Sequence, residues 1–598
     1  MTHLLHTALP IASVAFAPWI VPGASPHLAA LCRLVRRLGP ALLVMLCCVV
    51  GFAGCSPSAS AEDAEALVDA GIVEDAAAYQ RADVSSPDAA PWPSATDTSL
   101  PGCAPWSDAW VLPDVTMAKL KHPKGSLELE ASAVLQPIGE EETVRVSVRD
   151  AKGKQDAAAE GALNITTDPG IVVVTSQQVK GGTADVVLKV TKAGPHTLTA
   201  TLADGRAGHI KLWGFKTQLP IWRVDADPAD IATLYANPLE KIWIPATLTV
   251  AGETHTGKMR LHGGSSRTFS KKSFRLNLDK NQPLADGRRK LILRAEWVDK
   301  AMIRSYLAYE VVRHGTWLPA SRLTYVHLRL GARYHGLMLH PDRVDKHILT
   351  DHNLNPNGSL YEADPPFEKS VPGGNLTVAK AAADYKVLYQ HHEGTLNYVD
   401  LIELIEVVLQ LPDAQFADNI DRVVKVDDVL VFLAMSAVIQ NHDWVKKNYY
   451  LYRDPTATDS RWTIIPWDLD LSFGHLWTPE EDIFDEQIFT DGNPYVGMNI
   501  GQLFFNQLAD RLFNVKRFRT RYRSFLAHLL EKTFDKAFLE PRMNNALCRM
   551  QPDMLADDGK RAKNQEVRSR VQEVRDFVVA RRAWLTTWLK EDDPYAKK

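Results

Sequence analysis

The sequence predicts an α+β protein, in which a small all-β module precedes a larger domain of mixed strands and helices. Between about residues 127 and 215, short segments of alternating apolar residues are separated by turns that contain glycine. From about residue 218 onward, segments with strand periodicity and segments with helical periodicity both occur. With 598 residues, of which 45% are hydrophobic, the chain is long enough for several domains with cores of their own.

The charges of the chain are nearly balanced. Lys and Arg total 68 against 72 Asp and Glu, which gives a net charge of -4. A protein that binds nucleic acid normally shows a basic surface or a basic run. We therefore expect no nucleic-acid partner.

The N-terminal region, residues 1–55, has the pattern of an export signal. A basic segment at Arg33–Arg37 precedes an apolar run at Leu38–Phe52 and small residues before Cys55. This resembles a bacterial lipoprotein signal, which implies that Cys55 is lipidated and becomes the first residue of the exported protein. A membrane-spanning anchor is the alternative, but such a span needs roughly 20 apolar residues. Residues 1–31 precede the basic segment at which such a signal normally opens, so the true start is an open question.

Two further segments lead to the larger domain. Residues 56–105 are rich in Ala, Ser, Asp and Pro and contain few large apolar residues, which is typical of a disordered tether. In residues 106–215, Val144, Val146 and Val148 lie on one face of a predicted strand. This module is similar to bacterial immunoglobulin-like β-sandwiches, and we expect it to act in spacing or adhesion.

Cysteine usage agrees with export. Four of the six cysteines lie in or at the signal, which leaves Cys103 and Cys548. In an oxidising compartment these two could form a disulfide that ties the tether to the C-terminal region. Two unpaired thiols are the equally open alternative.

Acidic and amide residues cluster between residues 441 and 474. A helix with an apolar body, capped by Asp427 or Asp428, is predicted to end near Gln440, just before Asp443. Residues 449–453 and 462–467 flank a turn and read as an antiparallel hairpin. This register places Asn448 nearly opposite Asp468, and four side chains then share one end of the hairpin: Asp443, Asn448, Asp468 and Asp470. Carboxylates this close require a cation, and oxygen ligands suit Mg²⁺.

A second candidate site occupies residues 258–280. The loop HGGSSR lies between two strand-like runs, and such a loop can offer backbone amides to phosphate oxygens. In the following strand, Lys272 shares a face with Phe274, Leu276 and Leu278, so it points inward. A lysine at a strand edge with its ammonium in water is the alternative.

Five segments in this order resemble the CotH kinase family, the atypical protein kinases of the spore-coat CotH type. They are RLHGGSSRTFSKKSFRLNL, LILRAEWVDKAMIRSYLAYEVVRHG, YHGLMLHPDRVDKHIL, NHDWVKKNYYLY and IIPWDLDLSFG, and the resemblance extends over roughly residues 218–590. It implies a divergent protein-kinase-like domain over residues 216–595. The implied activity is transfer of a phosphoryl group from ATP, with Mg²⁺ or Mn²⁺, to Ser or Thr of exported proteins.

The resemblance also implies roles for single residues. Asp443 would be the catalytic aspartate, and Asn448 follows it by five, as the metal-binding asparagine does in protein kinases. Asp468 would bind metal with Asp470 as a helper. The ATP phosphates would be bound by the following residues: Lys272 or Lys271, Arg267, Gly263, Gly264 and Ser265. Where the family usually carries Glu, this chain has Asp342, so a lysine–carboxylate pair would depend on a shorter side chain.

Two other functions remain open at this stage. A surface-binding or adhesion protein could keep the kinase-like fold without catalysis, as Asp342 and the lipid anchor would allow. A hydrolase would need an activated nucleophile, but the sequence shows no GxSxG motif. Because Ser56 follows Cys55, we expect a lipid-anchored protein of the cell envelope, at the outer membrane or cell surface.

Overall fold

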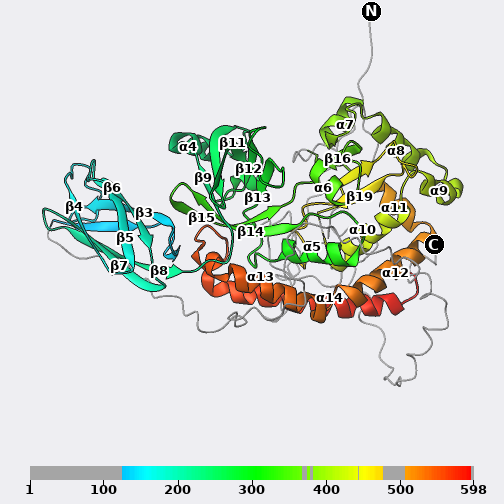
Figure 1. Cartoon of the computed structure of the whole chain (residues 1–598). Helices are drawn as coiled ribbons and strands as arrows, with labels where there is room; N and C mark the ends of the chain where they lie inside the picture. The colour runs from blue at the N-terminus through cyan, green and yellow to red at the C-terminus, as the bar shows by residue number, and fades with distance from the viewer. Residues whose placement is uncertain (1–123, 366–373, 377–381, 442, 476–505, 594–598) are drawn as a thin grey trace, which may run out of the picture. The chain divides into compact units, whose positions relative to one another are not determined.

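The computed structural model describes residues 124–365, 374–376, 382–441, 443–475 and 506–593 (Figure 1). The predicted signal with Cys55, the predicted tether and Cys103 lie outside these residues. Cys548 is disulfide-bonded; every other cysteine lies outside the described residues, so pairing with Cys103 stays a prediction. Among the described helices, none combines the length and apolar character that a membrane span requires.

The first described part consists of two four-stranded sheets (Figure 1). One sheet has the order β1 (Ser126–Glu130), β3 (Glu141–Arg149), β6 (Thr183–Val190), β5 (Ile171–Ser176). The other has the order β2 (Leu135–Pro137), β8 (Ala207–Phe215), β7 (Gly194–Leu202), β4 (Leu163–Thr167). Val144, Val146 and Val148 are fully buried, as their alternation predicts, and they share one apolar core with residues of the other sheet. Its likeness to an immunoglobulin domain stays a prediction.

A seven-stranded sheet follows. Its order is β13 (Lys290–Leu293), β12 (Phe274–Leu278), β11 (Glu253–Leu261), β10 (Ile244–Val250), β9 (Ile221–Asp225), β14 (Leu323–Leu330), β15 (Arg333–Pro341). Helix α4 (Pro228–Ala236) connects β9 to β10, and α5 (Arg304–Gly315) connects β13 to β14. The two edges of this sheet meet, because Arg294 and Leu339 exchange backbone hydrogen bonds of 2.7 and 2.9 Å. The sheet therefore closes around its own apolar core.

The third part combines a four-stranded antiparallel sheet with the remaining helices. The sheet has the order β17 (Tyr389–Glu393), β16 (Ser359–Ala363), β18 (Tyr449–Arg453), β19 (Thr463–Pro466). The helices are α6 (Lys346–Asp351), α7 (Ala382–Leu388), α8 (Val399–Gln410), α9 (Asp413–Asn419), α10 (Val426–Val438), α11 (Gln507–Phe513), α12 (Lys516–Lys532), α13 (Lys536–Ala556) and α14 (Asn564–Lys590). Mixed strands and helices confirm the predicted α+β class.

Two predicted helices illustrate what periodicity can reveal. In α14 the predicted apolar stripe is buried, from Val567 to Trp588, and the helix packs against α12 and α13. Helix α10 is apolar and almost wholly buried, as predicted. The predicted cap is wrong, however, because Lys425 is the N-cap residue and Asp428 lies in the first turn. There Asp428 accepts hydrogen bonds from Thr463 Oγ1 and Trp317 Nε1.

Candidate functional site

The hairpin β18–β19 brings the predicted acidic residues together. Tyr449 pairs with Pro466, and the Trp467 amide donates to the Asn448 carbonyl over 3.2 Å, so Asn448 lies one position from facing Asp468. Asn448 and Asp468 have φ angles of 63° and 53°. Few residues other than glycine adopt this left-handed conformation, and such residues gather at functional sites. The hairpin prediction is therefore confirmed, and the chain turns sharply at both residues.

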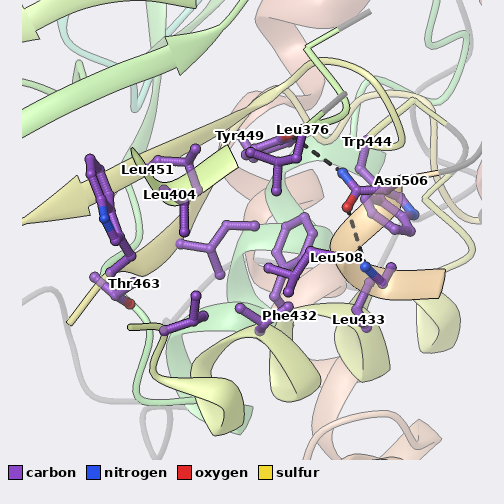
Figure 2. A pocket seen from close by; sticks show the side chains of 15 residues that line it. Leu376, Leu404, Phe432, Leu433, Trp444, Tyr449, Leu451, Thr463, Asn506 and Leu508 are labelled. Atoms are coloured by element: carbon purple, nitrogen blue, oxygen red, sulfur yellow. Dashed lines mark hydrogen bonds between the residues drawn. The ribbon is translucent and has the colours of Figure 1, made fainter. Parts of the chain in front are cut away.

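An apolar cluster holds the loop between α10 and β18 (Figure 2). Trp444 packs edge-on against Phe432 of α10, with ring centres 5.5 Å apart. The Asn506 amide donates to Tyr449 Oη and to the Val445 carbonyl, and its oxygen caps α11. The cavity among these side chains has a volume of about 20 Å³, room for about one water. The apolar side chains around this cavity position the loop, and the cavity is too small for a ligand.

Asp443 forms two polar contacts within this loop. Asn448 Nδ2 donates to Asp443 Oδ2 over 2.9 Å, and Lys447 Nζ lies 2.8 Å from the same oxygen. Burial raises the pKa of Asp443, an effect that Lys447 opposes. Burial lowers the pKa of Lys447, but Asp443 and Asp468 outweigh it and leave that pKa above its ordinary value. The side-chain NH₂ group of Asn448 thus donates to Asp443, and the side-chain oxygen Oδ1 is left as an acceptor.

Arg294 contacts the other two aspartates. Its guanidinium lies 2.5 Å from Asp468 Oδ1 and 3.1 Å from Asp470 Oδ2, and its Nε lies 2.8 Å from Glu296 Oε1. Burial and the charge of Asp468 raise the pKa of Asp470 well above its ordinary value. Burial lowers the pKa of Arg294, but the three carboxylates outweigh it and raise that pKa. We define the acidic cluster as Asp443, Asp468, Asp470 and Glu296. Arg294 pairs with three of these carboxylates, and Lys447 pairs with Asp443.

The predicted lysines do not contact this cluster. Lys272 Nζ donates to the Arg267 carbonyl over 2.8 Å, and Lys271 Nζ lies 2.6 Å from Asp557 Oδ2. Both lysines are buried, so each ammonium needs an acceptor, and each finds one away from the acidic cluster. Lys271 also donates to the carbonyls of Ala295 and Leu337. Lys272 points inward as predicted, and its contact with ATP phosphates stays a prediction.

The glycine loop is stabilised by its own arginine. Arg267 donates to the carbonyls of Gly264, Leu239 and Glu240. Gly263 has a φ of 103°, and a Cβ there would collide with Ser266 Oγ at 2.0 Å, so the turn requires glycine. A Cβ at Gly264 would meet nothing, and Ser265 begins a short 3₁₀ helix, Ser265–Thr268. The loop is thus ordered by internal contacts.

Asp342 also has a different partner from the predicted one. Its carboxylate lies 2.8 Å from Arg322 Nε and 3.6 Å from Arg288 Nη2. The lysine–carboxylate pair considered from the sequence is therefore not formed by Asp342. Lys271 forms such a pair with Asp557, which lies just after α13.

Sequence reasoning missed a basic face on the seven-stranded sheet. Arg260 on β11 lies directly opposite Arg275 on β12. Burial lowers the pKa of Arg275 to about 10, and Arg343 and Arg260 add to the effect. Burial lowers the pKa of His262 to about 3, as do nearby Arg275 and Arg294, whereas Asp468 raises it. The signal was present in the sequence, because both arginines alternate with buried apolar residues.

The acidic cluster is a candidate site for a hard divalent cation. Among the described residues, no group of three or more His, Cys, Asp or Glu side chains could hold a metal ion alone. Mg²⁺, however, usually takes one or two carboxylates and completes its shell with water and substrate phosphates. Asp468, Asp470 and the side-chain oxygen of Asn448, Oδ1, would provide such a donor set.

An Asp–Asn pair five residues apart, beside further carboxylates, is the arrangement with which protein kinases orient the substrate hydroxyl and hold metal ions. A model of the CotH kinase protein family matches residues 259–585, which is more than half of the chain. The chain therefore belongs to the CotH kinase protein family. Inner spore coat protein H of Bacillus subtilis is similar to it, at 25% identity over 349 residues, which cover 58% of this chain and 91% of that protein.

Solved structures give only weak likenesses. The ZirS C-terminal domain is 9% identical, with a TM-score of 0.13, over 28% of this chain and 99% of that chain. The Escherichia coli adhesin FdeC is 14% identical, with a TM-score of 0.14, over 28% and 63%. HipA with HipB and operator DNA from Shewanella oneidensis MR-1 is 12% identical, with a TM-score of 0.27, over 64% and 78%. None of these TM-scores is high enough to bear on fold or function.

Proposed function

We propose that this protein transfers the γ-phosphoryl group of ATP to Ser or Thr hydroxyls of an exported protein. The contact between Asp443 and Asn448 beside Asp468 and Asp470 carries the proposal. Phosphoryl transfer requires mainly positioning and neutralisation of charge, since the reacting groups do little covalent chemistry with the protein. The family membership of the chain supports the same reaction.

Asp443 is the group that faces the substrate hydroxyl in this proposal. Its raised pKa makes it a better proton acceptor than an ordinary aspartate, and its bond to Asn448 fixes one of its oxygens. The other carboxylate oxygen orients the hydroxyl and takes its proton as the hydroxyl oxygen bonds to the γ-phosphorus, while the bond from that phosphorus to the β–γ bridging oxygen breaks and ADP leaves. Lys447 opposes the rise in the pKa of Asp443 and so favours its ionised form.

ATP and a divalent cation are held by the remaining residues. Asp468, Asp470 and Asn448 would hold Mg²⁺ or Mn²⁺, which when bound neutralises charge on the phosphates. The basic face with Arg260 and Arg275 offers positive charge to the phosphates. The predicted phosphate contacts of the glycine loop remain part of the proposal: Gly263, Gly264, Ser265, Arg267, Lys271 and Lys272, with Asp342 as a positioning carboxylate.

The place of action is proposed from the N-terminal sequence. Lipidation at Cys55 would anchor the chain in the cell envelope, and residues 56–105 would hold the described domains away from the membrane. The similar Bacillus subtilis protein is named a spore coat protein, which is a surface-associated location. An exported protein is therefore the proposed substrate.

The test is transfer of label from γ-labelled ATP by the full chain in nonionic detergent, with Mg²⁺ or Mn²⁺ and a generic protein acceptor. Asp443→Asn and Asp468→Asn are expected to lose transfer. Asp459→Asn is the matched control, because this aspartate lies in the turn of the same hairpin, 48% exposed. Equal transfer by all four proteins would overturn the proposal.

A second candidate function is a non-catalytic binding or adhesion protein with a kinase-like fold. Arg294 pairs with both Asp468 and Asp470, and Asp342 pairs with arginines, which favours this reading. Calorimetric titration with ATP and Mn²⁺ separates the two. Absence of nucleotide binding, together with absence of transfer, would leave the binding protein.

A further inference from the structure

A hollow of about 190 Å³ is lined by the β12–β13 turn, the end of β15, the start of α6 and β17. None of the residues that form the acidic cluster lines it. Five of its lining residues are cationic: Arg288, Arg289, Lys290, Arg343 and Lys346. Two are carboxylates, Asp345 and Glu393. The lining therefore carries more positive than negative charge.

The two carboxylates contact Arg343 and the backbone at the start of α6. Asp345 Oδ2 lies 3.3 Å from Arg343 Nη1, and Asp345 Oδ1 accepts from the His347 amide as the cap of α6. Glu393 accepts from the Lys346 amide over 3.3 Å. Lys290 and Lys346 both have exposed side chains, and neither forms an ion pair within the described part of the chain. Arg288 pairs with Asp286, Asp342 and Asp351, which do not line the hollow. Within the described residues, the uncompensated positive charge of the lining therefore lies on Arg289, Lys290 and Lys346.

Arg343 is a cation of this hollow whose side chain is held in place by its contacts. It is 9% exposed, and its Nη2 lies 2.8 Å from His392 Nδ1. Because arginine can only donate, His392 Nδ1 accepts, and His392 Nε2 carries the proton that it donates to Glu362 over 2.7 Å. The guanidinium is therefore fixed from two sides, by Asp345 and His392. A fixed guanidinium loses little freedom when it binds a flat or tetrahedral anion.

The volume and the charge limit the ligand. Sites for drug-sized molecules have roughly 300–1,000 Å³, so this hollow suits a smaller group than a nucleotide. A phosphate monoester carries about -1.5 to -2 charges near neutral pH and three acceptor oxygens, which matches several cations better than a single carboxylate does. Although the Lys290 side chain reaches solvent, its partial burial lowers its pKa, and the charge of Arg343 adds to this effect, which Asp345 and Glu393 oppose.

We infer that this hollow binds a phosphate group, free or on a phosphorylated side chain, with Arg343, Lys290 and Lys346 as the contacting residues. The inference rests on the proposed function only in one respect, because phosphorylated side chains are the expected product of that reaction. The hydrogen bonds Arg343–His392–Glu362 lead from the hollow to β16, which ends beside Asp364. Burial and the charge of Glu362 raise the pKa of Asp364 to about 6, and Asp468 adds to this rise.

Calorimetric titration of the full chain in nonionic detergent tests the inference, with inorganic phosphate at constant ionic strength. Arg343→Lys keeps the charge but loses the planar guanidinium, which can donate two parallel hydrogen bonds to one phosphate, so binding is expected to weaken about tenfold. Lys290→Gln and Lys346→Gln change exposed positions that do not affect folding, and each is expected to weaken binding severalfold. Lys154→Gln, an exposed lysine of the two-sheet part, is the matched control and is expected to bind as the unaltered chain does.

Two comparisons complete the experiment. A phosphoserine peptide that binds more tightly than inorganic phosphate, and than its serine counterpart, identifies a phosphorylated side chain as the source; equal binding of phosphate and phosphopeptide identifies free phosphate. Absence of phosphate binding, or equal binding by all these variants, would overturn the inference. Loss of binding in Arg275→Gln alone would also overturn it, because phosphate would then lie on the basic face. Asp443→Asn is expected to bind phosphate normally, so failure of catalysis and failure of this site are separate results.

Discussion

Arg294 Nη1 lies 2.5 Å from Asp468 Oδ1, so an arginine of the seven-stranded sheet is paired with a proposed metal ligand of the hairpin. The same guanidinium reaches Asp470. A cation that binds these carboxylates must compete with Arg294 for their charge. We therefore expect Arg294 to lower the affinity of the proposed metal site.

We expect Arg294→Gln to bind Mn²⁺ roughly tenfold more tightly than the unaltered chain in the absence of nucleotide, since a charged hydrogen bond no longer competes. Calorimetry with Mn²⁺ measures this, with circular dichroism to confirm folding. Arg461→Gln is the control, because Arg461 pairs with Asp459 in the hairpin turn. Unchanged or weaker Mn²⁺ binding by Arg294→Gln would contradict the competition.

The pH dependence of transfer is expected to report the Asp443–Lys447 pair. Burial raises the pKa of Asp443, so its ionised form is lost at a higher pH than for an ordinary aspartate, and activity falls on the acid side. Lys447 opposes this rise. Lys447→Met is therefore expected to move the acid limb of the kcat profile to higher pH, whereas Lys447→Arg keeps it in place. An acid limb that does not move in Lys447→Met would show that another group titrates.

Arg275→Gln is expected to have opposite effects on stability and on nucleotide binding. Arg260 and Arg275 lie opposite each other on the neighbouring strands β11 and β12. Like charges in directly opposite positions lower the stability of a sheet by about 0.2–1 kcal/mol. Removing one of them is expected to raise Tm slightly in the absence of ligand and to weaken ATP binding. Differential scanning fluorimetry and ATP titration test both effects. A lower Tm, or unchanged ATP affinity, would show that the pair has a purely structural role.

The ion pair between Lys271 and Asp557 is expected to contribute strongly to stability. Their side chains are 1% and 0% exposed and lie 2.6 Å apart. Breaking a buried pair leaves an uncompensated charge, so Asp557→Asn is expected to lose about 3–5 kcal/mol in the free energy of unfolding. The double variant Lys271→Met with Asp557→Leu is expected to lose much less, because it leaves no buried charge. Urea denaturation measures the free energy of unfolding of both variants. Equal losses in the single and the double variant would contradict the prediction that an unpaired buried charge causes the loss.

Local patterns were enough to predict the parts of the site that lie close in sequence. The hairpin from Tyr449 to Pro466 follows from two β-rich runs around a turn, and this alone brings Asn448 to Asp468. The stripe of α14 and the alternating valines of β3 follow from periodicity in the same way. The α+β class was predicted on these grounds.

Long-range partners could not be predicted in this way. The partner of Lys271 is 286 residues away, and no local pattern distinguishes Asp557 from other aspartates. Arg294 reaches the acidic cluster only because the edges of the seven-stranded sheet meet at Leu339. Arg260 and Arg275 were visible as alternating positions, but their meeting depends on the register of β11 and β12.

The pairing of Lys271 with Asp557 has a consequence for synthesis of the chain. Asp557 also accepts a hydrogen bond from the Leu337 amide of β15, so one late residue completes contacts of two earlier segments. A ribosome that adds about 5–20 residues per second needs roughly 15–60 s to pass from Lys271 to Asp557. During that interval the glycine loop and β15 emerge without their carboxylate. The kinase-like domain therefore reaches its final form only after α13 has been made. In a chain that ends before Asp557, Lys271 would be buried without the carboxylate that neutralises its charge.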